Sequence, residues 1–166
     1  MDEIQKVCDL LDSLDIHYTL HRHEKVHTLE ECEAIDEAIG GKHCKNLFLT
    51  TRNGDALFMV LLAADKKYKT AVVSRQLNVS RLSFCTAEAL LEVLHLTPGA
   101  VNPFALMYDK EHRVKLAIDR DLQGDHDISF HPNSNEATIK LKYADFLHVL
   151  QAQGRTPVYI DAGQEE

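Results

Sequence analysis

One hairpin signal constrains the fold of this chain more than any other feature. Two apolar runs, residues 47–50 and 56–62, flank the dipeptide Asn53-Gly54, and Asn-Gly is typical of a tight two-residue β-turn. The second run is apolar at every position, which favours a strand that is covered on both faces. We therefore expect an antiparallel hairpin whose second strand lies at the centre of a sheet.

Helical spacing and end signals predict five helices around this hairpin. Apolar residues recur at helical spacing in residues 3–14, and a capping box with Thr28 as N-cap begins a helix that runs to about Ile39. A short helix is expected at residues 70–77, and a long last helix starts near Tyr143 and ends before Gly154. In the helix after Cys85, one apolar face is expected to carry Ala87, Leu90, Leu91 and Leu94.

The remaining apolar segments predict short strands, with an edge strand last. They lie at residues 18–22, 82–85, 104–108, 114–118, 128–131, 137–142 and 156–160. Helices and strands do not alternate regularly, and the sequence holds no repeat, linker or low-complexity block. We therefore expect a single α+β domain, residues 1–166, around a mostly antiparallel or mixed sheet.

Composition excludes several classes of function. The net charge of −8 argues against a general binder of DNA or RNA. Much of the basic charge lies between residues 42 and 81, which would allow a small RNA end to be held there, although scattered surface lysines explain the pattern equally. The four cysteines show no paired spacing and indicate reduced thiols. Without a membrane span or a signal peptide, we expect a cytoplasmic protein that does not contact membranes.

Neither a metal site nor a cofactor is expected. The sequence lacks the common phosphate-loop, dinucleotide, serine-hydrolase and zinc motifs. His17, His21, His23 and His27 are close in sequence, but no cysteine or carboxylate at ligand spacing accompanies them, so we interpret them as surface histidines. The acidic residues from Asp119 to Asp127 depart from calcium-loop spacing and are interpreted as a solvated loop.

Three segments are unusual on structural grounds. In residues 42–46, a strand that begins at Lys45 would place an ammonium against an apolar sheet, favouring a bound anion, unless the side chain simply reaches water. In residues 97–106, Pro98 and Gly99 suit the central positions of a turn. Such a loop either offers backbone N–H groups to an anion or is a plain connection. In residues 130–138, His131 at a strand end is either functional or a capped surface residue.

Together these segments resemble the prolyl-tRNA editing family, which comprises YbaK/ProX-type proteins and the editing insertion domain of bacterial prolyl-tRNA synthetase. The matching pieces are residues 45–49, 96–106 and 130–138, and the element order fits along nearly the whole chain. The proline-rich loop at 98–106 points to the alanine-removing ProX branch or its relative PrdX. The resemblance implies a curved mixed sheet flanked by helices, and hydrolysis of an aminoacyl-tRNA ester without a metal or a covalent intermediate.

The resemblance also implies roles for individual residues. Lys45, Gly99 and His131 match the catalytic positions: Lys45 as an electrostatic group, the Gly99 N–H as a donor to the oxyanion, and His131 as a residue that orients substrate. The substrate-binding positions are Asn46, Thr97, Pro98, Ala100, Val101 and Asn135. In a regular strand Lys45 and Asn46 face opposite sides, so both line one site only if the strand is bulged or has not yet begun.

The implied function is removal of alanine from proline tRNA in trans. The implied partners are the aminoacylated acceptor end of the tRNA and, as a candidate, prolyl-tRNA synthetase. Two alternatives stay open: a catalytically silent module that binds tRNA or the synthetase, and a deacylase for another small amino acid such as cysteine or serine.

Overall fold

The computed structural model describes residues 2–24 and 29–162; the predicted N-cap Thr28 lies outside them. The helices are α1 Glu3–Ser13, α2 Leu29–Ile39, α3 Thr70–Gln76, α4 Ala87–Leu94 and α5 Tyr143–Ala152, with 3-10 turns η1 Pro103–Tyr108 and η2 Arg120–Leu122. The strands are β1 Tyr18–Arg22, β2 Cys44–Thr50, β3 Leu57–Ala63, β4 Ser83–Phe84, β5 Val114–Asp119, β6 Asp127–Phe130, β7 Ala137–Lys142 and β8 Val158–Ile160. The predicted α+β class is confirmed.

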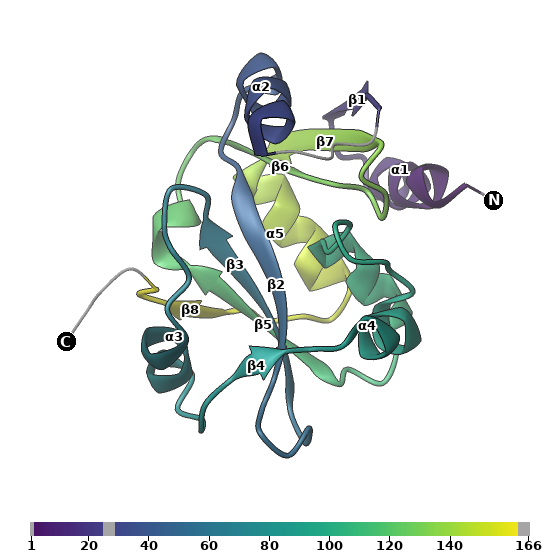
Figure 1. The fold of residues 1–166 in the computed structure, drawn as a ribbon. Helices are drawn as coiled ribbons and strands as arrows, with labels where there is room; N and C mark the ends of the chain where they lie inside the picture. The colour runs from purple at the N-terminus through teal and green to yellow at the C-terminus, as the bar shows by residue number, and fades with distance from the viewer. Residues whose placement is uncertain (1, 25–28, 163–166) are drawn as a thin grey trace.

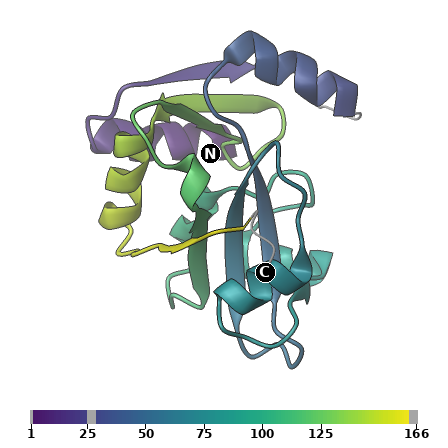
Figure 2. The same ribbon diagram turned by 90° about the vertical axis from the view of Figure 1, so that its left-hand side faces the viewer.

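The strands form two sheets that are joined at one residue (Figure 1). A five-stranded mixed sheet has the order β4-β2-β3-β5-β8, and a three-stranded antiparallel sheet has the order β1-β7-β6. Figure 2 shows the strands of the smaller sheet running across those of the larger. Lys42 links the two, because its N–H donates to Asp127 O (2.8 Å) and its carbonyl accepts from Ser129 N (3.0 Å).

The five-stranded sheet has one thickly and one thinly covered face. All seven residues of β3 are buried, as predicted for a central strand. On what we call the broad face, residues such as Phe48 and Met59 join the main core with α1, α4, η1 and α5. On the narrow face, Leu49 and Val60 pack against Val73 of α3. Each fully buried side chain of this size contributes roughly 1.5–3 kcal/mol, so both clusters stabilise the sheet substantially.

The hairpin of β2 and β3 is confirmed, but its predicted two-residue turn is wrong. Residues 51–56 form the connection. A type I′ turn needs positive φ at both central residues, whereas Gly54 has φ 72° and Asn53 does not adopt a positive φ. The Thr51 side chain accepts from Ala56 N at 3.2 Å and closes the wider loop instead.

The strand predicted at residues 104–108 is also wrong, because this segment forms η1. Pro103 occupies its first turn, where the fixed φ of proline suits a helical conformation. The buried Asn102 side chain caps the turn by accepting from Phe104 N at 2.9 Å. An apolar run of this length cannot be assigned to strand or helix by periodicity alone, and the cap decides it.

The predicted apolar face of α4 needs two corrections. Leu90 and Leu94 are buried as expected and Val93 completes the buried face, but Ala87 is exposed and Leu91 is 58% exposed. Ala87 and Leu91 are therefore surface residues of this short helix.

Candidate functional site

The site begins at an opening in the edge of β2. On this edge Lys42 pairs with β6, and Phe48 accepts from Cys85 N at 3.0 Å beside β4. Between these contacts, residues 44–46 pair with β3 on their other edge, but no strand of the described chain pairs with them on this edge. Because backbone polar groups alternate between the two edges of a strand, Asn46 shares the outward direction of Lys42 and Phe48. Its backbone therefore lies at the open edge.

The loop at residues 97–103 forms the turn that its sequence predicted. Ala100 N donates to Thr97 O at 3.2 Å, with Pro98 and Gly99 at the central positions. Gly99 has φ 94°, which the third position of a type II turn requires and which other residues adopt only with strain. Within the described chain, the Gly99 N–H donates to no protein acceptor.

Asn102 attaches this loop to the turn after β6. Its Nδ2 donates to Ala100 O (2.8 Å) within the loop and to Asn133 Oδ1 (2.9 Å) in the turn after β6. A methyl group built on Gly99 would lie 3.7 Å from Asn135 Nδ2, so the two segments also meet there. Asn102 is fully buried, which makes these hydrogen bonds costly to remove.

The first of two cavities at the opening, here the histidine cavity, lies where the two sheets meet. Its volume is about 60 Å³, and its lining includes His43, Cys44, Asn46, Ser129, His131 and Thr138. His131 Nδ1 lies 3.0 Å from Ala137 O, and since a carbonyl only accepts, we assign the proton to Nδ1. In the neutral ring this leaves Nε2 as an acceptor.

A second histidine in this cavity is paired with a serine. His43 Nε2 lies 3.0 Å from Asp36 O, which assigns the proton to Nε2, and Ser129 Oγ then donates to Nδ1 at 2.7 Å. The Asp36 carboxylate is 3.4 Å from the same Nδ1. Serine and aspartate thus share one ring nitrogen, unlike a catalytic triad, in which they occupy opposite nitrogens.

The second cavity, here the glycine cavity, wraps around the open edge of β2. It has a volume of about 170 Å³ and is lined by residues that include Asn46, Leu47, Phe84, Pro98, Gly99 and Val101. Asn46 belongs to the broad face and Leu47 to the narrow face, because neighbouring strand residues point to opposite faces. Asn46 lines both cavities and therefore joins them.

Lys45 lies on the narrow face. The register of β2 with β3 is regular through Lys45 and Asn46, without a bulge, so the two side chains face opposite sides. The exposed Lys45 lines neither cavity, and its Nζ donates to Lys66 O. The structure thus brings Gly99, Asn46 and His131 together on one side of the edge and places Lys45 on the other.

A buried aspartate fixes the segment that Lys45 touches. Asp119, predicted in a solvated loop, is instead fully buried; it accepts from Ala63 N (3.1 Å) and from Lys66 Nζ (2.8 Å). Lys66 also pairs with Asp121 at 2.8 Å. Burial lowers the pKa of Lys66, but its hydrogen bonds to the two carboxylates outweigh burial and raise that pKa above its ordinary value. The acidic spacing alone could not show which carboxylate turns inward.

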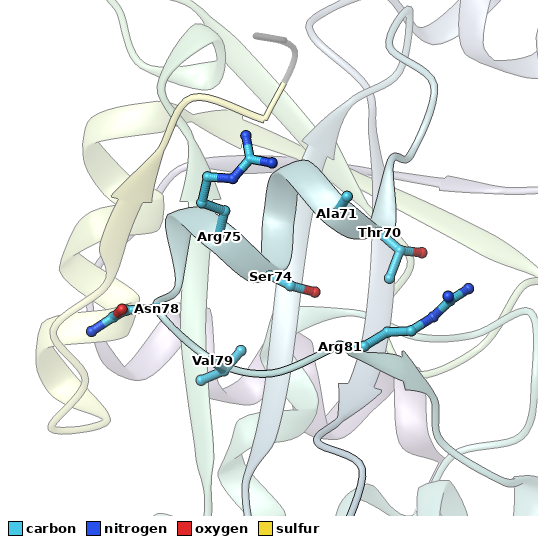
Figure 3. A pocket seen from close by; sticks show the side chains of 7 residues that line it. All are labelled: Thr70, Ala71, Ser74, Arg75, Asn78, Val79 and Arg81. Atoms are coloured by element: carbon cyan, nitrogen blue, oxygen red, sulfur yellow. The ribbon is translucent and has the colours of Figure 1, made fainter. Parts of the chain in front are cut away.

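A larger hollow than either of these cavities lies elsewhere, along α3 (Figure 3). It measures about 530 Å³ and runs between α3 and residues 78–81. Its lining carries no histidine, cysteine or carboxylate. Size alone therefore does not identify the site, because the convergent polar groups lie at the edge of β2.

Comparison with known proteins decides the family. Residues 23–149 match the model of the aminoacyl-tRNA editing domain. The chain belongs to this family. It is 36% identical over 156 residues to the prolyl-tRNA editing protein ProX of Acetoanaerobium sticklandii, covering 94% of this chain and 95% of that protein.

Further relatives agree with this assignment. The chain is 34% identical to the prolyl-tRNA synthetase associated domain-containing protein 1 of Danio rerio, over 92% of this chain and 83% of that protein. A solved structure of a proposed trans-editing enzyme for prolyl tRNA synthetase superposes with a TM-score of 0.71 at 16% identity, covering 96% and 97% of the two chains. The editing-domain fold is thus shown along almost the whole chain.

The structure groups most, not all, of the residues expected to serve this editing domain. Pro98, Gly99 and Val101 line the glycine cavity, and Asn135 approaches Gly99. Thr97 accepts the hydrogen bond of the turn but lines neither cavity. Ala100 is 4% exposed and packs into the core. Ala100 therefore supports the loop from beneath.

Sequence reasoning missed three polar residues of the editing domain. His43 and Ser129 come together because Lys42 pairs with β6, which joins segments 86 positions apart in the sequence. His23, expected as a surface histidine, packs edge-on against His131 with centroids 6.3 Å apart, and its Nε2 contacts Thr138 Oγ1 at 3.0 Å. The only feature of the sequence that could have indicated this position of His23 is that it directly follows the strand β1.

The thiols of the two cavities are poor nucleophiles. Burial, with a further contribution from the Asp36 carboxylate, raises the pKa of the Cys44 thiol far above its ordinary value. Burial raises the pKa of Cys85 to about 11. Both therefore stay protonated near neutral pH, and the thiolate is the reactive form.

Among the described residues, no three histidine, cysteine, aspartate or glutamate side chains gather so that they could hold a metal ion. No helix in the described part of the chain is long and apolar enough to cross a membrane.

Proposed function

We propose that this editing domain hydrolyses the ester of mischarged tRNA in trans, with alanyl-tRNA(Pro) as substrate. The observation that carries the proposal is the junction of the two cavities at Asn46, between the Gly99 turn and His131. In this arrangement the aminoacyl group occupies the glycine cavity. The histidine cavity, at about 60 Å³, has room for water, since one molecule needs roughly 10–15 Å³.

The reaction needs a placed water and a stabilised oxyanion. The water oxygen forms a bond to the ester carbonyl carbon, the bond from that carbon to the ribose oxygen breaks, and the ribose oxygen takes up a proton of the water. The unpartnered Gly99 N–H donates to the developing oxyanion. His131, held through Nδ1 on Ala137 O, orients the substrate with Nε2. The thiols stay protonated, which favours water over a covalent thioester.

The proposed preference for alanine follows from size. Alanine is smaller than proline, so a pocket built for proline admits it, and each missing methylene gives only ~1–3 kcal/mol of discrimination. A second, smaller hydrolytic site corrects such errors. The glycine cavity is bounded by a rigid Pro98-Gly99 turn that Asn102 ties down, so it is poorly able to widen for proline.

Lys45 serves the polyanionic part of the substrate in this proposal. Its exposed Nζ lies on the narrow face, beyond the open edge from Gly99, where the terminal phosphate rather than the carbonyl is its target. Selection of proline tRNA comes from the acceptor end or from bound prolyl-tRNA synthetase, the enzyme that appears in the names of several relatives. We place the protein in the cytoplasm, with its substrate.

The test is a deacylation time course with proline tRNA charged with alanine, cysteine, serine or proline. Loss of alanine alone, at a rate proportional to the concentration of this protein, is the expected result. Release of cysteine or serine instead of alanine would support the hydrolysis of aminoacyl-tRNA but assign a different amino acid as the substrate. Stability of all four esters alongside retained tRNA binding would leave only a binding module.

A further inference from the structure

Phe84 differs from every other phenylalanine of the chain in its exposure to solvent. The other five are at most 5% exposed, whereas Phe84, on the two-residue strand β4, is 61% exposed. Its ring is nevertheless held in place: it meets the Tyr68 ring edge to face, with centroids 5.6 Å apart and planes at 65°. An exposed aromatic ring in a fixed orientation offers a flat apolar surface at little entropic cost.

The position of Phe84 connects it to the proposed site. It lines the glycine cavity together with Gly99 and Asn46. In the register of β4 with β2 it stands opposite Leu49, and directly opposed residues share a face, so Phe84 belongs to the narrow face. The cavity thus runs from the proposed ester position, over the open edge of β2, to the exposed ring.

Exposed cations lie on the narrow face or close in sequence to this ring and its partner Tyr68. Lys45 lies on that face of β2, and the exposed Lys67 directly precedes Tyr68. The exposed Arg81 lies three residues before Phe84, and Figure 3 shows its side chain at the same end of the hollow along α3 as Thr70. A flat ring among cations is the arrangement with which proteins hold single-stranded nucleic acid, through stacked bases and paired phosphates.

We propose that Phe84 is the stacking platform for the terminal adenine of the tRNA. This rests on the proposed function, which places the ester at Gly99. The aminoacyl group then lies on the broad face, the terminal ribose crosses the edge of β2 at Asn46, and the adenine stacks on Phe84 with its phosphate near Lys45. A membrane does not fit this surface, because the three exposed large hydrophobic residues of the described chain lie on separate elements: Phe84 on β4, Leu91 on α4 and Val158 on β8.

The first test measures binding without hydrolysis. The chain contains no tryptophan, so Phe84→Trp introduces a single indole at the platform and Leu91→Trp a matched control. Both probes are titrated against the fluorescence of Phe84→Trp, and the quenching gives a Kd for each. We expect the Kd of the trinucleotide CCA to be at least about 5-fold lower than that of CC followed by an abasic ribose, because one stacked base contributes ~1–3 kcal/mol. Equal Kd values for CCA and the abasic probe would overturn the proposed stacking on Phe84. Equal quenching of Phe84→Trp and Leu91→Trp by CCA would overturn it as well.

The second test uses alanyl-tRNA(Pro) and Phe84→Ala, with Leu91→Ala as control. KM is expected to rise roughly 5- to 150-fold with little change in kcat, while alanine methyl ester, which has no base, is hydrolysed at the wild-type rate. An unchanged KM contradicts the platform. If the wild type deacylates no tRNA, the proposed function fails, and the fluorescence result still decides whether Phe84 binds the adenine.

Discussion

The two faces of the five-stranded sheet carry different kinds of buried charge. Under the broad face, Arg155 and Asp109 form an enclosed pair, with side chains 5% and 1% exposed and Nη1 to Oδ2 at 3.1 Å. Arg155 Nη2 also donates to Leu106 O and Asp109 O, at 3.1 and 2.8 Å. On the narrow face, Asp119 is equally buried, but its partner Lys66 is 19% exposed and reaches the surface carboxylate of Asp121.

This difference separates stability from substrate contact. The enclosed pair ties η1 to β5 and the segment after α5, so it keeps the loop that carries Gly99 attached to the core. The half-open pair instead fixes the backbone of Lys66, the acceptor for Lys45, at the surface. In the proposed function, the broad face therefore positions the reacting groups, and the narrow face positions the charge that would meet the tRNA.

The largest effect is expected from the enclosed pair. Arg155→Met leaves Asp109 buried without its cation, which costs about 3–5 kcal/mol in the free energy of unfolding. The surface pair Arg113–Glu92, 3.4 Å apart and 48% and 71% exposed, provides the control. Arg113→Met should change stability by less than about 1 kcal/mol. Urea unfolding of both variants measures the difference, and equal values would remove the distinction between the two kinds of charge.

Lys45→Ala should affect activity rather than stability. Loss of one charge-assisted contact to the terminal phosphate costs ~1.5–3 kcal/mol, so kcat/KM should fall roughly 10- to 150-fold. Because the Lys45 side chain is exposed, the melting temperature of the Lys45→Ala variant should match that of the wild type. Single-turnover deacylation compares this variant with Lys110→Ala, another exposed lysine away from both cavities. Wild-type activity in Lys45→Ala would contradict the role of the narrow face.

A smaller effect is expected at the joint between the Gly99 loop and the turn after β6. Asn102→Ala leaves Asn133 Oδ1, Phe104 N and Ala100 O without this partner, and an unsatisfied buried group costs about 1–3 kcal/mol. Both stability and the discrimination between alanyl and prolyl esters should decrease, as measured by thermal unfolding and by the ratio of deacylation rates. Asn53→Ala, in the exposed hairpin loop, should change neither.

The smallest effect on activity is expected at Cys85. With a pKa of about 11, its alkylation by iodoacetamide should accelerate ~10-fold per pH unit from neutral pH up to that value, since only the thiolate reacts. Near pH 7.5 the reaction should be about 300-fold slower than for a free cysteine with a pKa of about 8.5. Mass spectrometry against Cys85→Ser assigns the site, and this variant should deacylate within about 2-fold of the wild type. A plateau above pH 8.5 would show an ordinary thiol.

Local signals predicted the elements of the fold well, because each depends on neighbouring residues. The central strand β3 followed from its unbroken apolar run, and the turn at Gly99 from Pro98 and the need for positive φ. The failures occur where a side chain from a few residues away decides the backbone. Asn102 converts an apolar run into η1, and Thr51 widens the hairpin loop.

The sequence supplied candidate residues for the site but not their arrangement in space. Lys45, Gly99 and His131 were identified by their resemblance to a family, and strand alternation already indicated that Lys45 and Asn46 face opposite sides. The glycine cavity wraps around the edge of β2 because β4 pairs only with the far end of that strand, at Leu49 and Thr50. This pairing could not be predicted from the sequence. The pairing of His43 with Ser129 and the burial of Asp119 likewise follow from tertiary contacts alone.

Whether one substrate crosses the open edge of β2 is best decided by the structure of a complex with a stable analogue. The ligand is CCA whose terminal ribose carries alanine through an amide in place of the ester. We expect the alanyl carbonyl beside Gly99 and Asn46, the terminal phosphate near Lys45, and the adenine on the narrow face. An analogue held wholly on one face of β2, or in the hollow between α3 and residues 78–81, would contradict this arrangement.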